Sequence, residues 1–260
     1  MSGQSATPPT TDSSGPVTRN RIPSDTERCV LERLQGLSGC PRLRLQDGTT
    51  GDWRVEDPDG LTLSGSELLG QVDLGRFLAI AESLARLLGA IHKRGVVHQA
   101  LEPACIRVHP EDGRVWILDF VHATTFVETP LAFTDPSRPA GHPAYRSPEQ
   151  SGRMNRSVDD RTDLYSLGLV LYALATGAPP FEGEDPLALM HAHLARDPQP
   201  PHERAPWLPQ PLSRLILILL AKEPDDRYQS ATGLAHDLQR LRRAVAGQEP
   251  LAAIELRTLD

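Results

Sequence analysis

The sequence predicts an α+β domain in which the strands come early and the helices late. Three observations lead to this prediction. The first 60 residues combine one short helical pattern with two short strand patterns, residues 105–120 predict a hairpin, and the patterns found between residues 160 and 246 are all helical. Strands followed by a run of helices are typical of α+β folds. The chain has 260 residues, of which 39% are hydrophobic, so it can bury a sizeable core.

Residues 1–24 are dominated by Ser, Thr, Pro and Gly, and apolar residues are sparse. Such a segment cannot bury enough surface to offset its ordering entropy, so we expect a disordered tail. Order is expected to begin near Ser24. Either Ser24 or Asp25 can cap a helix there, and apolar residues follow at helical spacing, namely Val30, Leu31, Leu34 and Leu37.

Two short strands are expected next, in "PRLRLQD" and "GDWRVEDP", on either side of a turn at Gly48–Gly51. The stretch "LGRFLAIAESLARLLGAIHKRG" predicts a long amphipathic helix that ends at Gly95. The stretch "CIRVHPEDGRVWILDF" predicts a hairpin that turns at Glu111–Gly113.

The second half of the chain is expected to be helical. "DLYSLGLVLYALATG" is apolar nearly all round, as in a buried helix. Three more helical patterns follow it, in "PLALMHAHLA", "LSRLILILLAK" and "SATGLAHDLQRLRRAVA". Residues 247–260 have little pattern and are expected to form a linker or tail.

Composition argues against several classes of protein. The net charge is −7 and no dominant basic block occurs, so nucleic acid is not expected as a partner. The longest apolar run, Leu215–Ala221, is too short to cross a membrane. The three cysteines, Cys29, Cys40 and Cys105, lie far apart, which favours the reducing cytoplasm over a disulfide framework or a zinc site.

Five motifs occur in a fixed order along the chain. They are "HQALEPAC" from His98, "LDFV" from Leu118, "RSPEQ" from Arg146, the buried helix that contains Asp163, and "KEPDDRYQS" with Arg227. Together they resemble the catalytic loop, the D-F-G stretch, the A-P-E stretch and two later helices of the protein-kinase domain.

This resemblance implies a protein kinase-like fold with a truncated N-lobe and a complete helical C-lobe. Residues 25–95 are then residual N-lobe elements and the first large C-lobe helix, and residues 96–246 are the kinase-like C-lobe. A narrower resemblance exists in "AYRSPEQSGRMNRSVDDRTDLYSLG", which is similar to the N-terminal serine/threonine kinase-like domain of large bacterial ATPase and sensor histidine kinase signalling proteins.

The catalytic residues that the family uses are replaced here. Phosphoryl transfer in kinases requires a Gly-rich loop, a strand Lys paired with a helix Glu, a catalytic Asp, and an Asn and an Asp that hold Mg²⁺. Ala100 stands at the catalytic Asp position, Glu102 at a position that is often Lys, and Cys105 at the Asn position. Glu102 would repel a phosphate, and Cys105 is a poor Mg²⁺ ligand, expected instead as a small buried hydrophobe.

The phosphate-binding parts are missing as well. No Gly-rich loop precedes the first helix, and the first lysine of the chain is Lys93. Glu27 lies at the helix Glu position and is expected to be solvated and without a partner. Asp119 is the one member of the catalytic set that remains, and thus the one candidate for cofactor binding. Because a single ligand holds Mg²⁺ weakly, its expected role is instead a structural hydrogen bond.

The residues that build the scaffold are retained. The resemblance implies a buried ion pair between Glu149 and Arg227, and Asp163 as an acceptor for backbone N–H groups of the His98 loop. It also implies a hydrophobic stack formed by Leu31, His98 and Phe120. No metal site is expected, because His191 and His193 lie two positions apart on a helix and face different sides.

The preferred hypothesis is therefore a pseudokinase that acts as a regulatory or protein-interaction module in bacterial signalling. Its partner would be a signalling protein, with an ATPase or histidine kinase as one candidate, and no cofactor is expected. The alternative is an active serine/threonine kinase with displaced catalytic residues, which would use Mg-ATP. An inert remnant of a larger gene is a further alternative.

Overall fold

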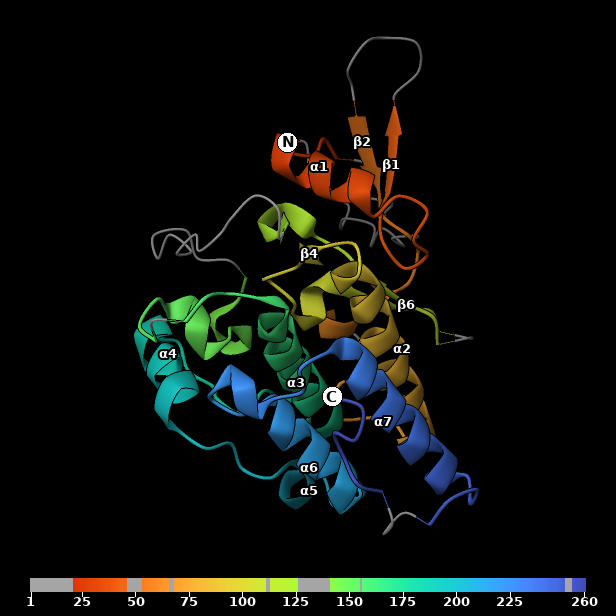
Figure 1. Ribbon diagram of the computed structural model, residues 1–260, viewed down its shortest axis with the longest axis vertical. Coiled ribbons are helices and arrows are strands. Elements are labelled where there is room, and N and C mark those ends of the chain that lie inside the picture. The colour runs from red at the N-terminus through yellow and green to blue at the C-terminus, as the bar shows by residue number, and fades with distance from the viewer. Residues whose placement is uncertain are drawn as a thin grey trace, which may run out of the picture.

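The computed structural model describes residues 21–45, 53–65, 68–110, 113–125, 141–154, 156–250 and 254–260. Most of the predicted disordered tail, the Gly48–Gly51 turn and the first two residues of the Glu111–Gly113 turn lie outside these residues. The predicted α+β architecture is present: a small lobe with a helix and strands lies above a larger helical lobe (Figure 1).

The small lobe consists of helix α1 (Asp25–Arg33) and the antiparallel strands β1 (Arg42–Leu45) and β2 (Trp53–Glu56). Ser24 caps α1, since its hydroxyl accepts the N–H of Glu27 at 3.2 Å. The ordered part of the chain starts earlier than Ser24, however. Arg21 forms an antiparallel bridge with Val55 on the edge of β2, so the expected tail boundary at residue 24 is wrong by a few residues.

The described residues contain two further small sheets. In the first, β5 lies between β3 and β6, and in the second β4 pairs with β7. Their bounds are Leu61–Thr62 for β3, Val96–Val97 for β4, Ile106–Val108 for β5, Val115–Ile117 for β6 and Thr124–Thr125 for β7. The predicted hairpin is thus β5–β6, whereas β3, β4 and β7 are too short to show a period in the sequence.

Among the described residues, the large lobe contains six helices: α2 (Leu74–His92), α3 (Asp160–Thr176), α4 (Pro186–Ala195), α5 (Pro201–Arg204), α6 (Gln210–Leu219) and α7 (Ala231–Val245). Helix α3 runs through the centre, as its apolar sequence predicts, and α2 lies beside α7 (Figure 1). Gly168 allows α6 to approach α3, because a Cβ at this position would lie 2.7 Å from the Cβ of Leu219.

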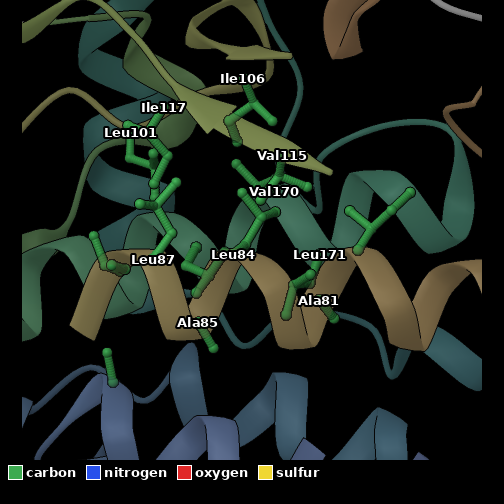
Figure 2. Close-up of a cluster of buried hydrophobic side chains, with 14 of the residues drawn as sticks. Ala81, Leu84, Ala85, Leu87, Leu101, Ile106, Val115, Ile117, Val170 and Leu171 are labelled. Atoms are coloured by element: carbon green, nitrogen blue, oxygen red, sulfur yellow. The ribbon is translucent and has the colours of Figure 1, made fainter. Parts of the chain in front are cut away.

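The main core lies between α2, α3 and the β5–β6 hairpin. Figure 2 shows Leu84 and Leu87 of α2 extending toward the hairpin, while Ala85 points to the opposite side of the helix. From the hairpin, alternate residues face this core, namely Ile106, Val115 and Ile117 (Figure 2). The inward-facing residues of the strands, spaced by two, and the inward-facing residues of α2, at helical spacing, therefore form one apolar layer.

The C-terminal segment differs from the expected linker. Residues 254–260 fold back onto α7, where Ile254 and Leu256 pack against the core and Asp260 bonds to the backbone before the helix. Single contacts of this kind leave no periodic pattern in a sequence, which is why the segment resembled a linker. Among the described residues, no helix is long and apolar enough to span a membrane.

Short 3₁₀ turns complete the described fold and hold most of the motif residues. They are η1 (Leu63–Gly65), η2 (Pro103–Cys105), η3 (Phe120–His122), η4 (Pro143–Tyr145), η5 (Pro148–Ser151) and η6 (Pro224–Asp226).

Candidate functional site

The loop that begins at His98 is hydrogen-bonded to a residue in the first turn of α3. The carboxylate of Asp163 is fully buried and accepts the backbone N–H groups of His98 and Gln99, both at 2.8 Å. It also bonds to Nε2 of His92 at 2.9 Å. Gln99 has a φ of 63°, which is uncommon for a residue other than glycine, so these bonds fix a strained loop backbone.

His98 and Phe120 are in contact beneath the small lobe. Their rings are 4.8 Å apart in an edge-to-face arrangement, and both residues are completely buried. Nε2 of His98 bonds to the carbonyl of Leu118 at 2.8 Å. Leu31 belongs to the same core, and its helix α1 packs against η3, which contains Phe120. The structure thus brings His98 and Phe120 of the expected stack into contact and places Leu31 in the core to which Phe120 belongs.

Ala100 presents only a methyl group at the catalytic Asp position. Gly141 lies directly over it, since a Cβ on Gly141 would be 3.3 Å from the Cβ of Ala100. Gly141 has a φ of +66° and therefore suits this turn better than other residues would. A methyl group cannot accept a proton, so this position cannot act as a base.

Glu102 contacts the segment that follows Gly141. Its carboxylate accepts the backbone N–H of His142 at 2.7 Å. The expectation that Glu102 would simply repel a phosphate is therefore incomplete, because the side chain has a structural bond of its own. This bond ties the loop at residues 98–105 to the segment at residues 141–146.

The thiol of Cys105 is used within its own turn. It accepts the N–H of Glu102 at 3.2 Å and donates to the carbonyl of the same residue at 3.0 Å. Burial raises the pKa of Cys105 well above its usual range, so the thiolate form that metals bind is disfavoured. Cys105 is a small buried residue, as expected.

Asp119 has a different environment from the one expected. The residue is exposed, has a φ of 62°, and its carboxylate makes no hydrogen bond to the residues that the structure describes. The expected structural hydrogen bond is therefore not present in this part of the chain.

Glu27 has a partner, contrary to expectation. Its side chain is fully buried, and both carboxylate oxygens accept hydrogen bonds from the guanidinium of Arg21. This ion pair lies at the position where kinases pair a strand Lys with a helix Glu. The bond to Glu27, with the nearby charges of Asp57 and Asp119, raises the pKa of Arg21.

Sequence reasoning missed Arg21 because it falls in the segment assigned to the tail. A search for lysine could not find it either. The one signal in the sequence is that Arg21 lies six residues before Glu27, the residue at the helix Glu position of the resemblance. Arg21 is brought there by its single bridge to Val55.

Glu149 and Arg227 form a bidentate ion pair between η5 and the residue after η6. The distances are 2.8 Å from Nη1 to Oε1 and 2.9 Å from Nη2 to Oε2, and both side chains are buried. Arg227 also donates to the carbonyls of Ala221, Arg161 and Lys222, so its guanidinium is well satisfied. The pair anchors the segment at residues 147–150 to the helical lobe.

The residues present do not fit the Mg²⁺ that the family uses. Cys105 replaces the Asn ligand with a buried thiol, whereas Mg²⁺ prefers oxygen. Asp119 is the one family Mg²⁺ ligand that the sequence keeps. Across the described ranges, no group of three or more His, Cys, Asp or Glu side chains is arranged to hold a metal ion.

The comparisons with known proteins agree with this geometry. Residues 70–238 match the family model described as the protein kinase domain. Serine/threonine-protein kinase PknB of Mycolicibacterium smegmatis is 34% identical over 197 residues, which cover 75% of this chain and 31% of that protein. PknB of Mycobacterium tuberculosis is 33% identical with the same coverage.

A third relative is the probable serine/threonine-protein kinase PknB of Corynebacterium glutamicum, 37% identical over 172 residues, or 65% of this chain and 26% of that protein. The chain thus spans about a third or less of the length of these curated relatives. Fold, motif order and family model agree, and the chain belongs to the protein kinase family.

Proposed function

We propose that this domain is a pseudokinase, a degenerate serine/threonine kinase-like domain that acts as a regulatory or protein-interaction module in bacterial signalling. The observation that carries the proposal is the state of the catalytic-loop positions. Ala100 has no reactive group, Glu102 bonds to the backbone of His142, and the thiol of Cys105 bonds within its own turn. The side chains of Glu102 and Cys105 thus serve to hold the loop, and Ala100 supplies no catalytic group.

The scaffold supports the same proposal. The ion pair of Arg227, the buried Asp163 and the contact of His98 with Phe120 hold the lobe together through residues of the scaffold. Arg21 fills the partner position of Glu27 with a residue of the chain itself. A domain held in this way can present a fixed surface to another protein while lacking the chemistry of its relatives.

The small lobe offers one surface suited to a protein partner. A cleft of about 810 Å³ opens between the end of α1, the following loop and β1 on one side and the β6 strand on the other. Its lining mixes basic residues such as Arg42 and Arg114 with acidic residues such as Glu56 and Asp59, and includes Trp116. A signalling protein in the cytoplasm, such as an ATPase or a histidine kinase, is the partner we propose.

The alternative is an active kinase with displaced catalytic residues, and Arg21 is the observation that favours it. A cation supplied from outside the usual strand lies next to Glu27, and Asp119 is near enough to influence its pKa. The relatives whose names describe serine/threonine kinases also fit this alternative. Arginine can contact phosphates, so the loss of lysine alone does not abolish nucleotide binding.

Transfer of radiolabelled phosphate from Mg-ATP decides between the two. We expect no transfer above background to generic protein substrates, and no thermal stabilisation on titration with Mg-ATP. Ala100→Asp is not expected to restore transfer. Catalytic groups act as a unit, and the Gly-rich loop and strand Lys that bind the phosphates are still missing. Transfer that disappears in Asp119→Ala would instead establish the active kinase, since a contaminating enzyme would be indifferent to that substitution.

A further inference from the structure

The carboxylate of Asp260 occupies a closed niche in front of α7. Its side chain is only 2% exposed, and its two oxygens accept the backbone N–H groups of Gln229 at 2.6 Å and Ser230 at 3.0 Å. Gly233 forms the wall of the niche. A Cβ at Gly233 would lie 2.7 Å from Oδ1 of Asp260, so the space for the carboxylate exists because this residue is glycine.

A second contact holds the same segment three residues earlier. The backbone N–H of Arg257 donates to Oδ2 of Asp237 at 2.6 Å, and the hydroxyl of Tyr228 donates to the same oxygen at 2.8 Å. Asp237 is 1% exposed. Arg257 has a φ of 65°, which is unfavourable for this residue type and persists only where contacts on both sides fix it.

Charged and apolar groups complete the interface. The guanidinium of Arg257 donates to the carbonyl of Asp226 at 3.0 Å and lies 3.5 Å from the carboxylate of Asp260. Ile254 and Leu256 pack against the main core. The segment therefore has an apolar part, a basic residue and an acidic residue, and each of these contacts residues elsewhere in the fold.

These contacts surround Arg227. The segment at residues 254–260 bonds to residues 226, 229 and 230, immediately before and after Arg227 and Tyr228. The side chain of Gln229 in turn donates to the carbonyl of Arg227 at 2.7 Å and accepts from Arg161 at 2.9 Å. The position of the guanidinium that binds Glu149 is thus fixed from its C-terminal side by this segment.

We propose that residues 254–260 are an intramolecular docking strap, and that the niche at the start of α7 is a binding site for a peptide of the pattern apolar–x–apolar–Arg–x–x–Asp. The occupant of the site is this chain's own segment. When it is docked, it fixes the junction between η6 and α7 and thereby the ion pair of Arg227. When it leaves, the junction loosens and the site becomes available to a peptide of the same chemistry.

Gly233→Ala tests whether the niche is filled. Alanine is the stronger helix former, so this substitution should stabilise a helix whose niche is empty. In the full chain it must instead expel the carboxylate of Asp260. We expect Gly233→Ala to lower Tm by a few degrees in the parent and to raise Tm in the Asp260→Ala background. An equal rise in both backgrounds would overturn the proposal, because it would show that Asp260 does not occupy the niche in solution.

Hydrogen exchange tests the release of residues 254–260 from the niche, and a labelled peptide tests docking into it. In full-length Asp260→Ala, we expect the amides of Gln229, Ser230 and Arg257 to exchange at least tenfold faster than in the parent. Glu255→Gln is the matched control, since it removes one negative charge from the exposed side of the same segment and should leave these rates unchanged.

A fluorescent peptide of residues 250–260 should bind Asp260→Ala saturably and bind the parent at least tenfold more weakly. The same peptide with Ala in place of its final Asp should not bind. The strap proposal would be overturned if amide exchange in Asp260→Ala were unchanged, or if the native peptide failed to bind the Asp260→Ala protein.

Discussion

Arg227 places two guanidinium nitrogens on the two carboxylate oxygens of Glu149, at 2.8 and 2.9 Å, across 78 residues of sequence. The side chain of Arg227 is completely buried and that of Glu149 is 1% exposed. Removing one partner of such a pair leaves a buried charge without compensation. We expect Glu149→Ala to lower the free energy of unfolding by about 3–5 kcal/mol, and Arg227→Ala by a similar amount. Urea denaturation followed by circular dichroism measures both.

Arg156 provides the matched control for this prediction. It is ion-paired with Glu223 at 3.2 Å, but the two side chains are 45% and 50% exposed. An exposed pair contributes at most about 1 kcal/mol, so Arg156→Ala should unfold close to the parent. If Glu149→Ala behaves like Arg156→Ala, the pair at Arg227 is not buried in solution and the kinase-like C-lobe is less tightly anchored than described.

Arg21 is expected to matter for stability although it lies before helix α1. Arg21→Gln leaves the buried carboxylate of Glu27 without its bidentate partner, which should cost roughly 1–3 kcal/mol. The pair Arg21→Met and Glu27→Leu together should cost less than Arg21→Gln alone, because no buried charge remains. Thermal unfolding of the three variants measures the effect. Equal losses would mean that Arg21 acts through packing and not through the ion pair.

The elements with a strong period were predictable from the sequence. The long helix α2, the buried helix α3 and the β5–β6 hairpin all follow from patterns that extend over several turns or strand residues. The pairing of Glu149 with Arg227 came from the order of the motifs and not from any period. It was predictable because the fold of the whole family brings these two positions together.

Arg21 and Asp260 could not be predicted in the same way. Each lies in a stretch without a pattern, and each is positioned by one or two backbone bonds: the bridge to Val55 in one case and the amides of Gln229 and Ser230 in the other. Single polar contacts between distant parts of a chain leave no periodic trace. Asp119 shows a second limit of sequence-based prediction. Its motif is present in the sequence, but the hydrogen bond expected from that motif is not found among the described residues.

Lys222 is predicted to weaken the fold at neutral pH. Its Nζ is buried without a hydrogen bond to the described residues, 5.0 Å from the ring of Phe181. Burial, opposed in part by Asp197 and reinforced by Arg227, lowers its pKa from 10.5 to about 8. The unfolded chain therefore binds more protons between pH 8 and 10.5, and the folded state gains stability as pH rises through that range.

Lys222→Met removes the charge and keeps an unbranched side chain. We expect this substitution to raise Tm at pH 7. Between pH 8 and 10.5, the stability of the variant should increase less with pH than that of the parent. Lys93→Met is a suitable control, because Lys93 is an exposed residue at the end of α2. Parallel pH curves for Lys222→Met and the parent would contradict the prediction.

His193 should make the fold sensitive to acid. The residue is 2% exposed, and its Nδ1 lies 3.0 Å from the hydroxyl of Tyr165. Burial and then the charge of Lys222 lower the pKa of His193 from 6.5 to about 4. The unfolded chain binds more protons in this window, so the stability due to neutral His193 is complete above pH 6.5 and is lost as pH falls toward 4.

The expected loss between pH 8 and pH 5 is roughly 2 kcal/mol, or about 4–8 °C in Tm for a domain of this size. His193→Gln cannot titrate and should therefore lose less stability than the parent over this range. His191→Gln is the matched control: His191 lies two residues earlier on α4 and is exposed, so its substitution should leave the pH dependence of the parent intact. Thermal scans of the three proteins from pH 8 to pH 5 measure the difference. The assignment to His193 is wrong if its variant follows the parent curve, because the acid sensitivity then arises from other groups.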